Sequence, residues 1–233
     1  MKKLPLTFLI TLFILTSNFV WSADFNKGLE ALEKGDFATA LLEWKPLAET
    51  GDSFAQYNLG QMYRQGEGVL QDYKTAVKWY TLAAEQGLSD AQFALSNMYT
   101  NGKGVPKNHK TAVKWLTLAA EQGFVKSYYN LGLKYSQGRG VVQDYMTAAK
   151  WYKLAAEIED VNAQVNLGVF YAMGKGVIKD MVYAHMWANI AASSGNENAV
   201  GFRDALEKDM TSADVSQAQK LARGCVAKNY KGC

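Results

Sequence analysis

AQYNLGQMYRQGEGVLQDYKTAVKWYTLAAEQGLSD, residues 55–90, is the stretch that decides the fold, because its pattern returns three more times without a gap. The further copies occupy residues 91–126, 127–162 and 163–198. A fixed period of about 20–50 residues is typical of a solenoid, in which each unit buries its apolar face only against its neighbours. The sequence therefore predicts stacked repeats that present an extended surface, and it does not indicate a domain built around a catalytic pocket.

The first half of each repeat has the pattern of an amphipathic helix. Leu59 and Tyr63 are four residues apart, so both side chains lie on one face of the helix. Gly60 follows the leucine, and we expect a small residue at this position to let the partner helix approach closely. The leucine and the tyrosine return in every copy, and the glycine is replaced only once, by Ser96.

The second half of each repeat predicts a second helix. Its N-cap residue can accept hydrogen bonds from the exposed amides of the first turn. Ala76, Trp79 and Ala83 then have the spacing of a buried stripe, with one large indole among small alanines. The N-cap position holds Asp72, Asn108, Asp144 and Asp180, and the tryptophan position holds Trp79, Trp115, Trp151 and Trp187.

Glycines mark the turns of each repeat. Gly66 and Gly68 supply positive φ in the loop between the two helices, and we expect the following Val69 to point inward. Such a glycine pair would hold a phosphate only with a preceding strand and a third glycine, and the pattern has neither. Gly87 ends the second helix as a C-cap glycine. The third repeat has Glu159 at this position, so we expect its inter-repeat turn to differ.

The shared pattern AxxxLGxxYxxGxGVxxDxxxAxxWxxxAAxxG resembles the Sel-one-like repeat, a longer-looped relative of the tetratricopeptide repeat. The four copies cover 144 residues. The resemblance implies an all-α, right-handed α/α solenoid whose first helices line a concave face. It also implies an interaction scaffold for protein or peptide partners, often at bacterial envelopes.

One secreted branch of the resembling family is associated with penicillin binding and β-lactam hydrolysis. Its members carry a cysteine pair within each repeat, whereas no repeat of this chain contains a cysteine, and the chain has no SxxK motif. We therefore expect a protein without catalysis of its own. A β-lactamase-like envelope enzyme is the weaker alternative.

Atypical units flank the four repeats, as the ends of a solenoid require. Residues 24–54 keep Asp36 and Gly51 at the offsets of the repeats but have a shorter loop, which predicts a tetratricopeptide-like N-terminal cap. Residues 199–233 predict two capping helices. Thr211 with Asp214 resembles a capping box for the last helix.

Cys225 and Cys233 are the only cysteines of the chain. In an oxidising compartment, two cysteines this close predict a local disulfide that clamps the C-terminal end. The alternatives are two free thiols or an intermolecular link. Two sulfurs without a nearby histidine cannot complete a tetrahedral metal site, so neither a metal nor another cofactor is expected.

The N-terminus has the three parts of a secretory signal peptide, with Lys2 and Lys3, an apolar stretch over residues 4–15 and a polar end. We assign it to residues 1–23 and expect a periplasmic or secreted protein, although an uncleaved membrane anchor is the alternative. The signal contains two of the 25 basic residues and none of the 22 acidic ones, so the exported chain has 23 basic residues against 22 acidic. This near-neutral balance does not favour a nucleic-acid partner.

Polar side chains of the first helices form the candidate binding site. Asparagine recurs at one register, and further amides flank it, so these groups can hold an extended peptide backbone by paired hydrogen bonds. The alternative is that the asparagines support loops. Aromatic side chains of the same surface could instead stack on peptidoglycan or another polysaccharide. The candidate residues are Asn58, Gln61, Asn97, Asn130 and Asn166.

The two histidines, His109 and His185, stand in no constellation typical of catalysis or metal binding. His109 occupies a position that holds Tyr73 in the first repeat. We therefore interpret both histidines as packing residues.

Overall fold

The computed structural model describes residues 23–233, so nearly all of the predicted signal peptide lies outside the described residues. Within the described range the chain forms helices and no strands. The helices are α1 (Phe25–Glu33), α2 (Phe37–Glu49), α3 (Ser53–Gln65), α4 (Tyr73–Glu85), α5 (Ser89–Asn101), α6 (His109–Glu121), α7 (Lys126–Gln137), α8 (Tyr145–Ala156), α9 (Val161–Met173), α10 (Met181–Ser193), α11 (Glu197–Glu207) and α12 (Ser212–Ala227).

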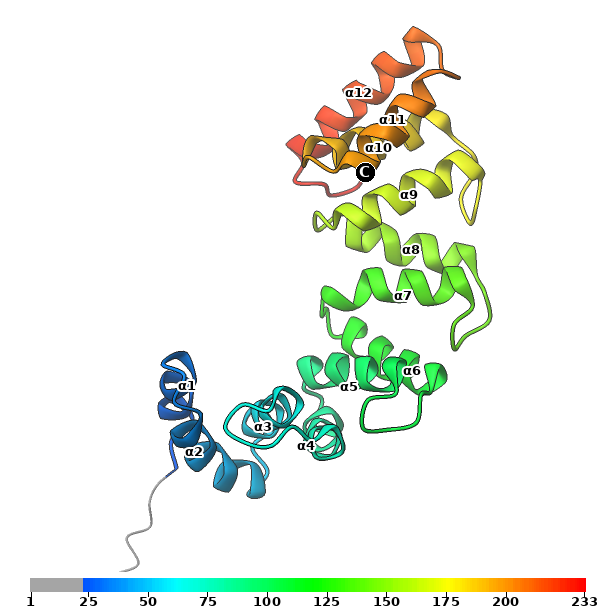
Figure 1. Cartoon of the computed structure of the whole chain (residues 1–233). Coiled ribbons are helices and arrows are strands. Elements are labelled where there is room, and N and C mark those ends of the chain that lie inside the picture. Colours follow the sequence, from blue (N-terminus) through cyan, green and yellow to red (C-terminus); the bar gives the residue numbers. More distant parts are fainter. Residues whose placement is uncertain (1–22) are drawn as a thin grey trace, which may run out of the picture.

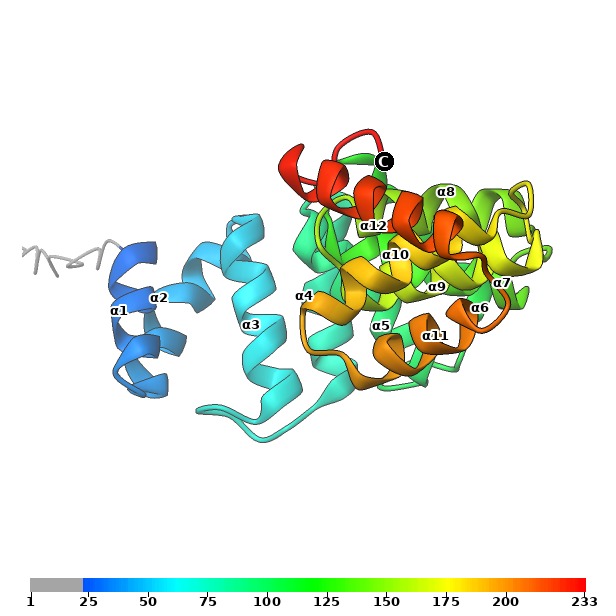
Figure 2. The same ribbon diagram turned by 90° about the horizontal axis from the view of Figure 1, so that it is seen from above.

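The helices stack in consecutive pairs along a curved path, from α1 at one end to α12 at the other (Figure 1). Each helix packs mainly on its neighbours in sequence, which is the contact pattern of a solenoid. The C-terminal end breaks this order, because α11 and α12 both pack on α10 (Figure 2). The prediction of an all-α solenoid is confirmed.

The second helix of each repeat begins at the predicted N-cap residue. Asp72 accepts from the amides of Lys74 and Thr75 at the start of α4. Its other carboxylate oxygen accepts from the Thr75 hydroxyl at 2.6 Å, and these hydrogen bonds lower the pKa of Asp72. Asp144 caps α8 with the same set of bonds, Asp180 accepts from two amides of α10, and Asn108 accepts from one amide of α6.

A close helix–helix contact explains the recurring glycine of the first helix. A Cβ atom on Gly60 would lie 2.6 Å from the ring of Tyr80, and one on Gly132 would lie 2.5 Å from the ring of Tyr152. Only glycine leaves room for a tyrosine that is fully buried here. The second repeat has Ser96 in place of the glycine and the smaller Leu116 in place of the tyrosine.

The prediction that all four tryptophans are buried is wrong for three of them. Trp79, Trp115 and Trp151 are half-buried, and the residue that follows each of them enters the core instead. Each indole packs against a core that the preceding unit shares with the first helix of its own repeat. Trp187 alone is fully buried. The predicted alanines are buried in all four repeats.

The prediction of a different turn in the third repeat is also wrong. Glu159 adopts φ 66°, the left-handed conformation that Gly87 and the other C-cap glycines adopt. Its amide donates to the carbonyl of Ala156 at 3.1 Å, which matches the bond from Gly87 to Ala84. Neighbouring helices thus impose the same turn on a residue for which this backbone conformation is strained.

The loops between the paired helices contact the preceding unit. A Cβ atom on Gly104 would overlap the carbonyl of Tyr73, and Gly140 stands in the same relation to His109. This second glycine is therefore needed both for its positive φ and for the close approach. The following valines are partly buried, as predicted, and pack on the cores: Val69, Val105, Val141 and Val177.

The C-terminal unit is fastened by a disulfide and by a buried histidine. Cys225 and Cys233 form the predicted disulfide, with Cα atoms 5.6 Å apart. Thr211 caps α12 and accepts from the Asp214 amide, as predicted. His185 is fully buried in α10, and its Nε2 atom lies 2.8 Å from a carboxylate oxygen of Glu207 in α11. The histidine therefore ties the last repeat to the first capping helix.

Candidate functional site

Three adjoining cavities follow the first helices of the N-terminal half. The first cavity, of about 160 Å³, is bordered by α1, α2 and α3. The second cavity, of about 330 Å³, is bordered by α3, α5 and the start of α7. The third cavity, of about 170 Å³, is bordered by α5, α6 and α7. Tyr57 and Gln61 line both the first and the second, and Asn97 lines both the second and the third. We call this row of adjoining cavities the first-helix groove.

Four of the five candidate residues line the first-helix groove. Asn58 belongs to its first cavity, Gln61 to the first and second, Asn97 to the second and third, and Asn130 to the third. Asn166 lies on α9, outside these cavities. Its side chain faces Tyr129 and partly offsets the rise in the pKa of Tyr129 that burial causes.

Gln61 is fixed by side chains of its own repeat. Its amide nitrogen donates to the Tyr57 hydroxyl at 2.7 Å, and its oxygen accepts from Arg64 and from the Tyr80 hydroxyl, both at 2.9 Å. Burial raises the pKa values of both tyrosines, so the Tyr80 hydroxyl stays protonated and donates to Gln61, while the Tyr57 hydroxyl accepts from it. Gln61 therefore holds the groove wall in place, and its amide has little hydrogen-bonding capacity left for a ligand.

Asn97 and Asn130 are better placed to meet a ligand. Asn97 is exposed between two cavities, and its backbone carbonyl accepts from Asn101 at 2.9 Å. Asn130 uses its amide nitrogen for the carbonyl of Lys126 in the preceding turn, also at 2.9 Å, which leaves its side-chain oxygen as an acceptor.

The groove also contains aromatic side chains, which the sequence indicated for this surface, and cationic side chains, which it did not single out. Phe93 and Phe124 are half-buried in the second cavity, with ring centroids 5.3 Å apart. Lys126 lies above the ring of Phe124, 6.0 Å from its centroid. Phe93 stands at a register that holds Tyr57 and Tyr129 in other repeats, so the pattern does indicate an aromatic residue there, whereas Phe124 and Lys126 do not recur at their registers. The cations of the second and third cavities are Arg64, Lys103, Lys126, Lys134 and Arg139.

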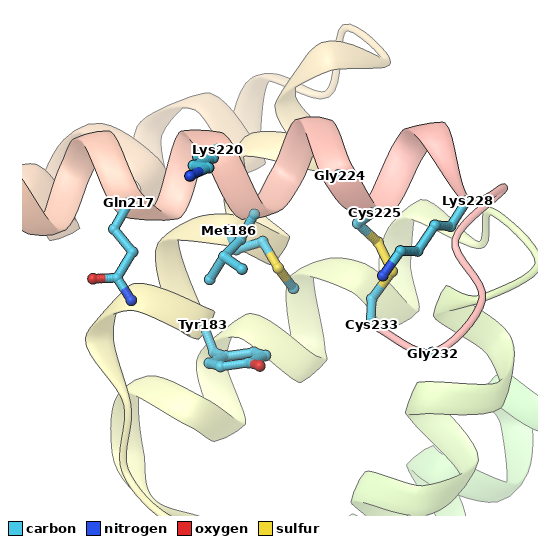
Figure 3. Close-up of a pocket in the computed structure, with 10 residues that line it drawn as sticks. Tyr183, Met186, Gln217, Lys220, Gly224, Cys225, Lys228, Gly232 and Cys233 are labelled. Atoms are coloured by element: carbon cyan, nitrogen blue, oxygen red, sulfur yellow. A yellow bond between two sulfur atoms is a disulfide. The ribbon is translucent and has the colours of Figure 1, made fainter.

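A separate cleft of about 610 Å³ lies at the C-terminal end, between α10 and α12 (Figure 3). Tyr183 and Met186 reach into it from α10, and the disulfide closes one end. This cleft belongs to the end cap, where α12 packs mainly on α10.

Neither histidine forms a catalytic arrangement in the described part of the chain. The Nδ1 atoms of both His109 and His185 lack a hydrogen-bond partner, and His185 contacts only Glu207 through its other nitrogen. Residues 23–233 contain no cluster of His, Cys, Asp and Glu side chains that could hold a metal ion. None of the helices in this range is long and apolar enough to cross a membrane.

A stack of paired helices with a groove along its first helices defines a tetratricopeptide-like repeat protein, a class generally used for protein–protein interaction. The Sel1 repeat model matches residues 53–88, 89–124, 125–160 and 161–196. The chain therefore belongs to the Sel1 repeat family. The disulfide indicates an oxidising environment for this member.

Solved structures agree with this assignment. The chain is 34% identical to a Sel1 repeat protein from Oxalobacter formigenes, with a TM-score of 0.74 over 77% of this chain and 74% of that one. It is 29% identical to a protective antigen of uropathogenic Escherichia coli that displays an SLR fold, with a TM-score of 0.53. That match covers 90% of this chain but only 55% of the antigen, so the chain spans about half its length. No curated protein matches the chain.

Proposed function

We propose that this protein is an exported scaffold that binds an extended segment of a partner polypeptide along the first-helix groove, without catalysis of its own. The observation that carries the proposal is the row of adjoining cavities along the first helices, in which each cavity shares residues with the next. A peptide of several residues can therefore remain in contact from α1 to α7. Solenoids use such extended surfaces for binding.

Export to the periplasm or beyond the cell is part of the proposal. The basic and apolar N-terminus has the pattern of a signal peptide, and the Cys225–Cys233 disulfide suits an oxidising compartment. Both features favour a partner in the envelope.

Site-directed photo-crosslinking tests the function directly. A benzophenone amino acid is placed at Asn97 in the groove or, as a matched control, at Lys114, which is equally exposed but lies on the second helix α6. Each full-length variant is expressed in the bacterial envelope and irradiated. We expect protease-sensitive adducts from Asn97 and few from Lys114. Equal adducts from both positions, or none from either, would contradict the proposal.

A further inference from the structure

The second and third cavities of the groove have a strong charge imbalance. They are lined by five cationic side chains and a single carboxylate, Asp90. The whole chain, in contrast, has 25 basic residues against 22 acidic ones. The positive charge of these cavities is therefore a local property of the surface and does not follow from the composition.

The cations of these cavities have no carboxylate partners. None of the ion pairs in residues 23–233 includes any of them. Two are instead oriented by neutral groups, since Arg64 donates to Gln61 at 2.9 Å and Lys134 donates to the Thr100 hydroxyl at 3.1 Å. Their charges are thus held in place while remaining available to an anion.

The third cavity brings like charges together. Burial lowers the pKa of Lys134, and repulsion from Arg139 and Lys107 lowers it further. A cation in this position is destabilised unless an anion approaches, because opposite charges within about 4–6 Å favour the charged form. Charge complementarity of this kind also accelerates association and suppresses partners of the wrong sign.

Apolar surface lies among these cations. The half-buried rings of Phe93 and Phe124 border the second cavity, and Lys126 lies over the second ring. A polypeptide can offer an apolar side chain to the rings and carboxylates to the cations from one extended backbone. An anionic polysaccharide has carboxylates and could stack a sugar ring on one aromatic face, but the two half-buried rings are tilted by 48° to each other, which suits a compact apolar side chain better than a flat sugar ring. The combination therefore favours a peptide.

We propose that the part of the groove between α3 and α7 selects an acidic peptide segment, with carboxylates flanking an apolar residue that packs on Phe93 and Phe124. This inference rests on the proposed function and adds the chemistry of the partner. Carboxylates would meet Lys103 and Lys126 beside the second cavity and Lys134 and Arg139 in the third.

The repeats themselves supply a well-matched charge-reversal test. Lys103 and Arg139 lie between the two loop glycines, and the first repeat has Glu67 at this position, so glutamate is compatible with the loop. Lys175 is the equivalent residue of the fourth repeat. The Nζ atom of Lys175 lies 5.2 Å from the ring centroid of Tyr145, and the Nζ atom of Lys103 lies at the same distance from the ring centroid of Tyr73. Unlike Lys103, Lys175 borders none of the three groove cavities.

Fluorescence anisotropy with the full exported chain measures binding of a labelled peptide in which glutamates flank a central leucine. A peptide with glutamines in place of the glutamates and a labelled polyuronate are run beside it. We expect the acidic peptide to bind most tightly, and added salt to weaken it. The double variant Lys103→Glu/Arg139→Glu should weaken it by about tenfold or more, the effect of losing about 1.4 kcal/mol. Lys175→Glu should change the affinity less than twofold.

The outcomes separate the two proposals. Equal binding of the glutamate and glutamine peptides would overturn the acidic preference and leave the peptide scaffold intact. Tighter binding of the polyuronate than of either peptide would overturn both and assign the groove to an anionic polysaccharide. An equal loss of affinity in Lys175→Glu and the double variant would also overturn the inference, because the effect would then come from net charge alone.

Discussion

The three internal repeats and the last repeat share one sequence pattern but differ in what covers them. Trp79, Trp115 and Trp151 remain half-buried, whereas Trp187 is fully buried in the core beneath α12. The internal repeats also border the groove, and Asn166 of the last repeat does not. A tryptophan at the same register is therefore fully buried in the last repeat and half-buried in the internal repeats. The helix that covers the repeat decides how deeply it is buried.

The tryptophans give the largest expected difference between these regions. Replacement of fully buried Trp187 by alanine should lower the free energy of unfolding by about 4 kcal/mol, because it leaves a large cavity. The change Trp115→Ala should cost about half as much, since that side chain is already partly in contact with water. Urea unfolding of both variants measures the two losses. Equal losses would show that α12 does not bury the last tryptophan more deeply.

The end cap can be loosened without touching the internal repeats. The double variant Cys225→Ala/Cys233→Ala should lose about 2.5 kcal/mol or less, because the disulfide closes a short loop. Thermal unfolding under non-reducing conditions measures the loss. Partner binding in the groove should remain unchanged. A parallel loss of groove binding in a folded variant would mean that the cap and the internal repeats act as one unit.

The fold of the repeats was predictable because packing recurs with the period. N-cap residues such as Asp72, the glycine at Gly60 and the alanines opposite it all served the predicted roles. The partial burial of the Trp115 side chain was not predictable, because it depends on how one helix pair packs against the next. The periodic pattern indicated an aromatic residue at the register of Phe93, but it gave no sign that Lys134 borders the same groove, since no other repeat has a cation at that register.

The turn at Glu159 gives the smallest expected effect. Glycine adopts φ 66° without strain, but glycine also costs entropy in the unfolded chain, so Glu159→Gly should raise the free energy of unfolding by about 0.5–1 kcal/mol. Gly87→Glu is the reciprocal change at the matched turn, where a Cβ atom would meet no neighbour. It should lower stability by a similar amount. Chemical denaturation that shows a destabilised Glu159→Gly would indicate that the carboxylate has a role beyond the turn.

The central claim is that the first-helix groove of the internal repeats binds the partner, separately from the packing that stabilises the stack. The most direct measurement combines photo-crosslinking from Asn130 with the melting temperature, in the chain with and without the paired changes Asn97→Ala and Lys126→Ala. Both replaced side chains are exposed in the groove. We expect the melting temperature to change by less than about 2 °C, as for most surface substitutions, while the yield of adduct falls severalfold. An unchanged yield in the doubly substituted chain would contradict the account.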